Sequence, residues 1–258
     1  IEEQRSNDAI RAAGAAIAYV QVCGNDRGAV GDDHTDWPGM LDALDDAGYA
    51  GPLGLESFTG DNETIAVAAS VWRPLAPSQD ALAERSHAFL TALRDQPGRA
   101  RSATLVRPSG RRTSPRSLAP QRKEHAMSTH PVTLFTGQWA DLPFEEVARL
   151  AASWGYDGLE IAASGDHLDL RRADEEPGYI EQKLEVLDRY GLKVFALSNH
   201  LAGQAVCDSP IDFRHEAILR DYVWGDGDAE GVRQRAAEDM KRSARVARKL
   251  GIDTVVGF

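Results

Sequence analysis

A short local pattern occurs five times in this chain and strongly restricts the folds that it can form. In each copy an amphipathic helix is followed by a glycine and then by a short apolar stretch, at Gly14, Gly48, Gly155, Gly191 and Gly251. Glycine suits the position after a helix, because this position often needs the left-handed backbone conformation. The apolar stretches are nearly continuous, as expected of parallel strands that are covered on both faces. Because helices and strands alternate, the sequence predicts an α/β protein with a parallel sheet.

We expect six strands, at about residues 15–22, 52–57, 132–136, 157–162, 193–198 and 253–258. A doubly wound sheet would accommodate six strands, but no glycine-rich phosphate-binding loop follows any of them. Polar residues instead follow several different strands, which is how a (β/α)8 TIM barrel builds its site. The sequence therefore predicts an incomplete (β/α)8 barrel that lacks two strands.

The stretch of residues 95–126 separates two acidic segments. It contains seven Arg, one Lys, four Pro and two acids, and no apolar period runs through it. Such a stretch cannot bury enough surface to offset the entropy of ordering, so we expect no regular structure and early cleavage by trypsin. It is a solvated linker, a nucleic-acid-binding arm or translated intergenic sequence. We favour the third interpretation, because residues 122–124 can be encoded by a purine run resembling a ribosome-binding site, two codons before Met127.

The chain is thus predicted to consist of residues 1–94, a disordered linker at 95–126, and residues 127–258. Ile1 lies inside a helical pattern and Phe258 inside an apolar strand. We therefore interpret the chain as the tail of one gene product that is joined to the head of its neighbour.

The distribution of charge excludes some partners. The formal net charge of −11 includes +6 from the linker (eight basic and two acidic residues), which leaves −17 on the flanking segments. This balance argues against nucleic acid and anionic membranes as partners. Cys23 and Cys207 form neither a disulfide framework nor a metal-type spacing. No signal peptide or membrane-spanning apolar run is visible, so we expect a cytoplasmic protein.

Residues 1–94 contain the motifs NDRGAVG, DHTDW, LESF and VWRPLAP. In this combination they resemble the last two βα units of the sugar phosphate isomerase/epimerase family, the xylose isomerase-like TIM barrels that include D-tagatose and D-psicose 3-epimerases. The resemblance implies one divalent metal ion (Mn²⁺, Mg²⁺ or Co²⁺), held by carboxylates and a His after strands five to eight. It also implies that Glu56 is the strand-eight metal ligand, and that Arg27, with Asn25 in the same motif, binds the substrate.

One position departs from the family pattern. Gln21 stands where the epimerases carry a metal-binding His. Its amide oxygen can bind a hard cation, so Gln21 is a candidate ligand, although it supplies neither charge nor an imidazole nitrogen. His34 either reaches the site as a substrate-binding residue or caps the next helix. The ligands expected from strands five and six are absent, so we expect an incomplete metal cage and an inactive chain.

Residues 127–258 resemble the amino-terminal half of another member of the same superfamily. The matching stretches, which cover strands one to four, are VTLFTGQWADLPFEEVARLAASWGYDGLEIA, SNHLAGQAVCD, DFRH and VWGDGD. Glu160, Asp166, His167 and His200 follow strands two and three, on the barrel face that carries the site. His200 is the strongest candidate, because it follows an apolar strand, where burying a polar group costs free energy unless it has a partner. A structural contact in a polar loop is an equally good interpretation of the other three.

The resemblance implies proton transfer next to the carbonyl of a sugar or sugar phosphate. The metal polarises the ketose oxygens, one carboxylate removes a proton to form an enediolate, and a second returns it. We predict catalytic roles for Glu56, Glu160 and His200, and substrate-binding roles for Asn25, Arg27, His34 and His167. Two alternatives are a non-catalytic fusion that binds a sugar or a protein partner, and an endonuclease IV-like metal-dependent hydrolase, which the net charge disfavours.

The order of the strands leads to a geometric prediction. The first segment supplies strands seven and eight of a barrel and the second supplies strands one to four. Strand eight neighbours strand one in a closed barrel, so the stretch 52–57 should pair with 132–136. Arg27, Glu56, Glu160 and His200 should then surround one mouth. The open barrel edges are expected to support a homo-oligomer.

Overall fold

The computed structural model describes residues 5–60, 71, 73–96 and 130–257. Nearly all of the predicted linker lies outside the described residues, and the disorder and protease sensitivity predicted for it stay predictions.

The six described strands form one parallel sheet in the order in which they occur along the chain. They are β1 (Val20–Val22), β2 (Leu53–Leu55), β3 (Val132–Phe135), β4 (Gly158–Ala162), β5 (Lys193–Ser198) and β6 (Val255–Val256). The pairing that was predicted across the linker is present, since Leu53 lies opposite Val132 in a parallel ladder between β2 and β3. The fold is an incomplete (β/α)8 barrel with strands in the order seven-eight-one-two-three-four, as predicted.

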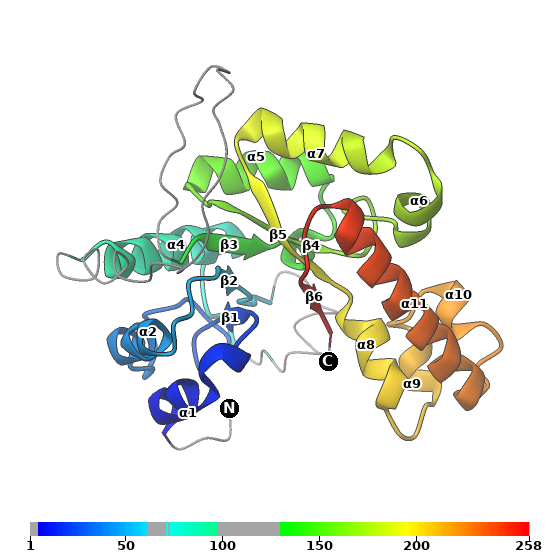
Figure 1. The fold of residues 1–258 in the computed structure, drawn as a ribbon, viewed down its shortest axis with the longest axis horizontal. Helices are drawn as coiled ribbons and strands as arrows, with labels where there is room; N and C mark the ends of the chain where they lie inside the picture. Colours follow the sequence, from blue (N-terminus) through cyan, green and yellow to red (C-terminus); the bar gives the residue numbers. More distant parts are fainter. Residues whose placement is uncertain (1–4, 61–70, 72, 97–129, 258) are drawn as a thin grey trace, which may run out of the picture.

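Helices surround the strands, which lie at the centre of the molecule (Figure 1). The longer ones are α1 (Ser6–Ala13), α2 (Trp37–Asp46), α4 (Gln79–Arg94), α5 (Phe144–Trp154), α7 (Tyr179–Tyr190), α8 (His200–Cys207) and α11 (Ala229–Lys249). Shorter ones are α6 (Leu170–Glu175), α9 (Phe213–Glu216) and α10 (Asp221–Trp224), with 3-10 turns η1 (Gly14–Ala16) and η3 (Thr136–Trp139). Helix α4 packs on β3, α5 on β4, and α7 and α11 on β5. None of the helices within the described ranges is long and apolar enough to cross a membrane.

The local signals in the sequence account for most helix ends. All five glycines of the recurring pattern have a positive φ. Gly155 and Gly191 close α5 and α7 in the left-handed conformation, with φ of 92° and 70°. Asp36 and Ser78 cap α2 and α4 through side-chain oxygens that accept backbone N–H groups. Asp36, and not His34, is therefore the cap of α2.

The predicted strand at 15–22 was wrong in its first half. Gly14 to Ala16 form a 3-10 turn that is closed by a hydrogen bond from the Ile17 N–H to the Gly14 carbonyl, and β1 begins only at Val20. The apolar run was correctly recognised, but a turn at its start can hold apolar residues as readily as a strand can.

One hydrophobic core extends across both segments. It includes Leu53 and Leu55 from β2, Leu134 from β3, and Leu159 and Ile161 from β4, all of which are fully buried. The strands β2, β3 and β4 are buried along their whole length, whereas both residues of the edge strand β6 are half-buried. A smaller core joins α8, α10 and α11. The buried central strands hold the rim, at which the candidate site lies, in a fixed position.

Candidate functional site

The three predicted catalytic residues meet beside three strands of the sheet. Glu56 follows β2, Glu160 lies on β4, and His200 follows β5 as the first residue of α8. The Nδ1 atom of His200 lies 3.5 Å from Oε1 of Glu56. Its Nε2 atom lies 3.8 Å from Oε1 of Glu160. The parallel sheet brings these residues together because all its strands end at one rim.

Glu160 is held by donors from both segments of the chain. Its side chain is fully buried. The Tyr19 hydroxyl donates to its Oε2 at 2.8 Å, and the Gln21 amide donates to its Oε1 at 2.8 Å. The Ser198 hydroxyl also donates to Oε1. Burial raises the pKa of Glu160, and these three donors act in the opposite direction by stabilising the carboxylate. The side chain of Glu160 thus has a fixed orientation.

Burial places Glu56 and His200 in unusual protonation states. Burial, with a contribution from the charge of Glu160, raises the pKa of Glu56 to about 8, although Arg27 opposes this. Burial lowers the pKa of His200 to about 4. Near neutral pH, Glu56 is therefore mostly protonated and His200 is neutral, so their contact joins two uncharged groups. Glu56 can release or accept a proton near the pH at which enzymes work.

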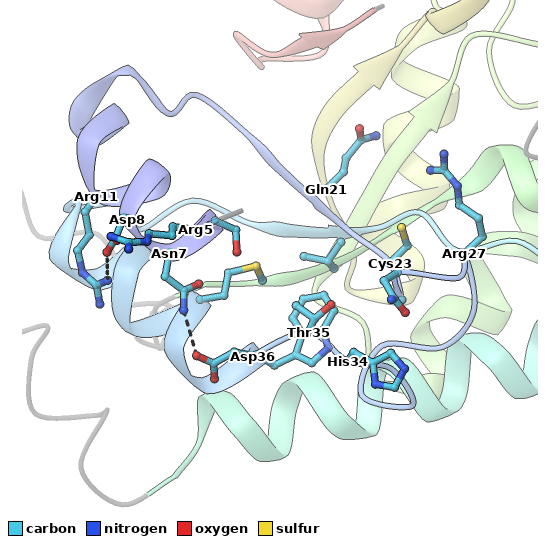
Figure 2. A pocket seen from close by; sticks show the side chains of 16 residues that line it. Arg5, Asn7, Asp8, Arg11, Gln21, Cys23, Arg27, His34, Thr35 and Asp36 are labelled. Atoms are coloured by element: carbon cyan, nitrogen blue, oxygen red, sulfur yellow. Dashed lines mark hydrogen bonds and ion pairs between the residues drawn. The ribbon is translucent and has the colours of Figure 1, made fainter. Parts of the chain in front are cut away.

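A cavity of about 870 Å³ lies beside β1 and is lined by residues of the NDRGAVG motif. Gln21, Asn25, Arg27 and His34 are among its lining residues. The side chains of Gln21 and Arg27 point to the same side of the β1 end, whereas His34 lies in the loop that precedes α2 (Figure 2). The backbone of Arg27 has a φ of 74°, which places it in the left-handed region within a tight turn. The residues predicted to bind the substrate in the first segment therefore share one cavity.

The structure separates His167 from this group. Its Nδ1 lies 2.9 Å from the Thr136 hydroxyl and its Nε2 lies 3.1 Å from the Leu142 carbonyl, and the ring is buried. The neighbouring Asp166 accepts a hydrogen bond from the Phe144 N–H at the start of α5. Both residues make structural contacts, and the substrate-binding role predicted for His167 stays a prediction that this placement does not support.

The divalent metal ion that the resemblance implies would need several ligating side chains close together. Within residues 5–60, 71, 73–96 and 130–257, no group of three or more His, Cys, Asp and Glu side chains is arranged to hold a metal ion. Both carboxylate oxygens of Glu160 already accept hydrogen bonds, and Gln21 is oriented with its amide nitrogen toward Glu160. The part of the chain that the structure describes therefore does not form a metal cage, and Glu56 and Gln21 stay predicted ligands.

Sequence analysis missed two residues that contact Glu160. Tyr19 lies two positions before Gln21, and residues with this spacing along an extended chain point to the same face. Ser198 is the last residue of β5, two positions before His200. The spacing from Gln21 could have identified Tyr19 as an interior polar group. Nothing in the sequence distinguishes Ser198 from an ordinary strand-end serine.

Comparison with known proteins agrees with this architecture. The family described as xylose isomerase-like TIM barrel matches residues 148–258. The match covers less than half of the chain, so it shows what residues 148–258 are similar to. Glu160 and His200 lie in this xylose isomerase-like part of the chain. The sheet continues from this part through β3 into the first segment.

Two curated relatives carry epimerase names. The chain is 36% identical over 92 residues to an L-ribulose 3-epimerase of Mesorhizobium japonicum. It is 34% identical over 90 residues to a probable ketose 3-epimerase of Synechocystis sp.. Each match covers 35% of this chain and 31% of the relative, so the match extends over about a third of each relative's length. The similarity to these two relatives is thus confined to about a third of this chain.

Proposed function

We propose that this chain carries part of the active site of a ketose isomerase or epimerase that acts on a sugar or sugar phosphate. The observation that supports it most directly is the contact of His200 with both Glu56 and Glu160 at the rim of a xylose isomerase-like barrel. The names of the relatives support a ketose as the substrate class. The acidic character of the chain disfavours nucleic acid as a substrate.

The three side chains suit proton transfer at a carbon next to a carbonyl. A general base works best when its pKa lies near the working pH, and the pKa of Glu56 is about 8. Glu160 is held on a different strand from Glu56, so a proton could leave one face of the carbon and return on the other. The neutral His200 can donate a hydrogen bond to an oxygen on which negative charge develops. Arg27 would hold a hydroxyl or a phosphate of the substrate.

The divalent ion that the resemblance implies has two predicted ligands in this chain, Glu56 and Gln21. When bound, a divalent ion polarises the oxygens of a ketose. Glu56 and Gln21 would need further ligands, and the described residues supply none in a suitable position. We propose that the chain on its own binds a ketose weakly without turning it over. The origin of the chain from two neighbouring genes is a separate hypothesis, which the sequence of the flanking DNA would test.

Ligand-observed NMR with L-ribulose tests the sugar-binding part of this proposal. We expect saturation transfer to the sugar with the native chain and a clear loss with Arg27→Ala. The control is Arg149→Ala, which removes an exposed arginine on α5 that pairs with Glu146. Failure of every ketose and ketose phosphate to show transfer would count against the proposal.

An activity assay tests the catalytic part. We expect no 3-epimerisation of ketoses by the 258-residue chain in the presence of Mn²⁺, Mg²⁺ or Co²⁺. Turnover that depends on the metal and disappears in Glu56→Ala would show that the metal cage is completed, for example by a second chain.

A further inference from the structure

Residues 5–96 and residues 130–257 meet at a surface that we call the seam. The seam has the features of a specific protein–protein interface. In the sheet, β2 and β3 pair over three residues of each strand. Beyond the strands, the Leu53 N–H donates to the Pro131 carbonyl at 2.8 Å. The core is shared, because α4 from the first segment packs on both β3 and α5.

Side-chain bonds cross the seam along its whole length, and several involve buried groups. The Nε2 atom of the buried His130 lies 3.0 Å from Asp45, and its ring stacks on Tyr49. The bonds between α4 and the second segment are Trp139 Nε1 to Asp80 at 2.8 Å, the Tyr156 hydroxyl to the Ala83 carbonyl at 2.9 Å, and Arg94 to Asp157 at 3.2 Å. Each bond needs one partner from either side of the linker.

The candidate site is itself part of the seam. Glu160 belongs to the second segment, yet two of its three donors, Tyr19 and Gln21, belong to the first. Likewise, Glu56 and His200 come from opposite sides. If the segments separated, Glu160 would lose two of its three donors. Separation would also expose the apolar residues of β2 and β3.

We propose that the two segments bind each other through the seam without needing the covalent link, so that the site is assembled by a non-covalent complex. The partner of residues 130–257 is the acidic segment 5–96, and it is recognised by the paired strands and by the four contacts of His130, Trp139, Tyr156 and Asp157. The covalent connection then adds only a high effective concentration of one segment around the other.

Cutting the full chain at one position tests this proposal. A site-specific protease sequence is inserted between Pro108 and Ser109, and the folded protein is then cleaved. We expect both fragments to co-elute in a one-to-one ratio, with the amide NMR signals of Tyr19 and Glu160 at unchanged positions. Fragments that elute separately, or the loss of these signals after cleavage, would overturn the proposal.

A pair of tryptophan variants tests whether the seam contacts provide the affinity. Trp139→Phe removes the bond to Asp80, whereas the control Trp224→Phe alters a residue of the smaller core, away from the seam. Exchange of fragments between labelled and unlabelled cut chains, followed by native mass spectrometry, gives the dissociation rate. We expect Trp139→Phe to raise this rate about five- to tenfold and Trp224→Phe to change it less than about twofold. Equal rates for the two variants would show that the named contacts do not hold the complex.

Discussion

At the residue scale, the carboxylate of Glu160 is bound by more donors than any other group of the candidate site. It lies where no water can replace a missing donor, because it is fully buried. Three hydroxyl and amide groups keep it oriented toward His200. The position of the strand-end Glu could be predicted from the sequence, but its partners could not, because they lie up to 141 positions away in the chain.

Removal of one donor should destabilise the protein. In Tyr19→Phe, Glu160 loses the hydrogen bond at its Oε2, and we expect the free energy of unfolding to fall by about 1–3 kcal/mol. Tyr190→Phe serves as the control, since its hydroxyl lies 3.4 Å from Glu145 at the exposed surface, and we expect a change below about 0.5 kcal/mol. Urea unfolding followed by circular dichroism measures both. Equal losses would show that the buried hydrogen bond contributes nothing specific.

The shifted pKa of Glu56 should make stability depend on pH. Its folded pKa of about 8 lies above the ordinary value of 4.5 for a glutamate, so the folded state binds this proton more tightly than the unfolded state. The associated stability is fully present below pH 4.5 and is lost as the pH rises through 8. We expect the urea midpoint of the native chain to fall between pH 5 and pH 8.5 relative to that of Glu56→Gln. The exposed Glu181→Gln is the control, which should follow the native chain.

His200 should act in the opposite direction. Its folded pKa of about 4 lies below the ordinary value of 6.5 for a histidine, so the stability it contributes is present above pH 6.5 and is lost as the pH falls through 4. A His200→Gln variant should therefore lose less stability than the native chain between pH 6.5 and pH 4. A parallel loss in both proteins, measured by urea unfolding at each pH, would contradict the lowered pKa.

At the scale of helices and strands, the glycines after the helices allow a comparison between two nearly equivalent turns. Gly155 and Gly191 both have positive φ. A Cβ at Gly191 would meet no atom within 4 Å, whereas a Cβ at Gly155 would lie 2.9 Å from Cε1 of His87 on α4. We expect Gly191→Ala to cost about 1–2 kcal/mol for the backbone alone. Gly155→Ala should cost about 1 kcal/mol more, because His87 must move.

Thermal or urea unfolding of the two variants measures this difference. The double variant Gly155→Ala/His87→Ala should recover the excess, relative to His87→Ala alone, and leave only the cost of the backbone. If the excess persists without the His87 ring, the contact between α4 and the α5 turn is not its cause.

The elements themselves were largely predictable, because their signals are local. Each signal depends on a few consecutive residues, as for the glycines after the helices, the caps at Ser78 and Asp228, and the apolar strands. The start of β1 was not predictable, since a 3-10 turn and a strand share the same apolar composition. The position of His167 was also not predictable, because its partners Thr136 and Leu142 belong to other elements.

At the scale of the whole molecule, the sheet ends in two strands that each have one described neighbour. These edge strands are β1 and β6. Edge strands with free backbone groups pair readily with other chains. We therefore expect self-association, seen in sedimentation velocity as a mass that rises above 28.0 kDa with increasing concentration. A mass that stays at the monomer value up to high concentration would contradict this expectation.

The order of the strands could be predicted, because the strands of a closed barrel follow one another in a ring. The side-chain contacts across the seam could not be predicted. Parallel strands eight and one must be neighbours in any closed barrel, whatever links them. The contacts of His130 with Asp45 and of Trp139 with Asp80 depend on side-chain placement, which no local pattern encodes. The roles predicted for the site residues stay predictions that the proposed experiments can test.

The pairing of β2 with β3 also has a consequence for the time course of folding. Its partners, such as Leu53 and Val132, are roughly 80 residues apart, whereas β3 with β4 and β4 with β5 join residues roughly 25–35 apart. Contacts between near neighbours in sequence form sooner, so β1 should pair with β2, and β3 with β4 and β5, before the two segments dock. The long closure adds little to the equilibrium cost, because this cost grows only with the logarithm of loop length. Weakening the late-forming contacts should therefore speed unfolding much more than it slows refolding.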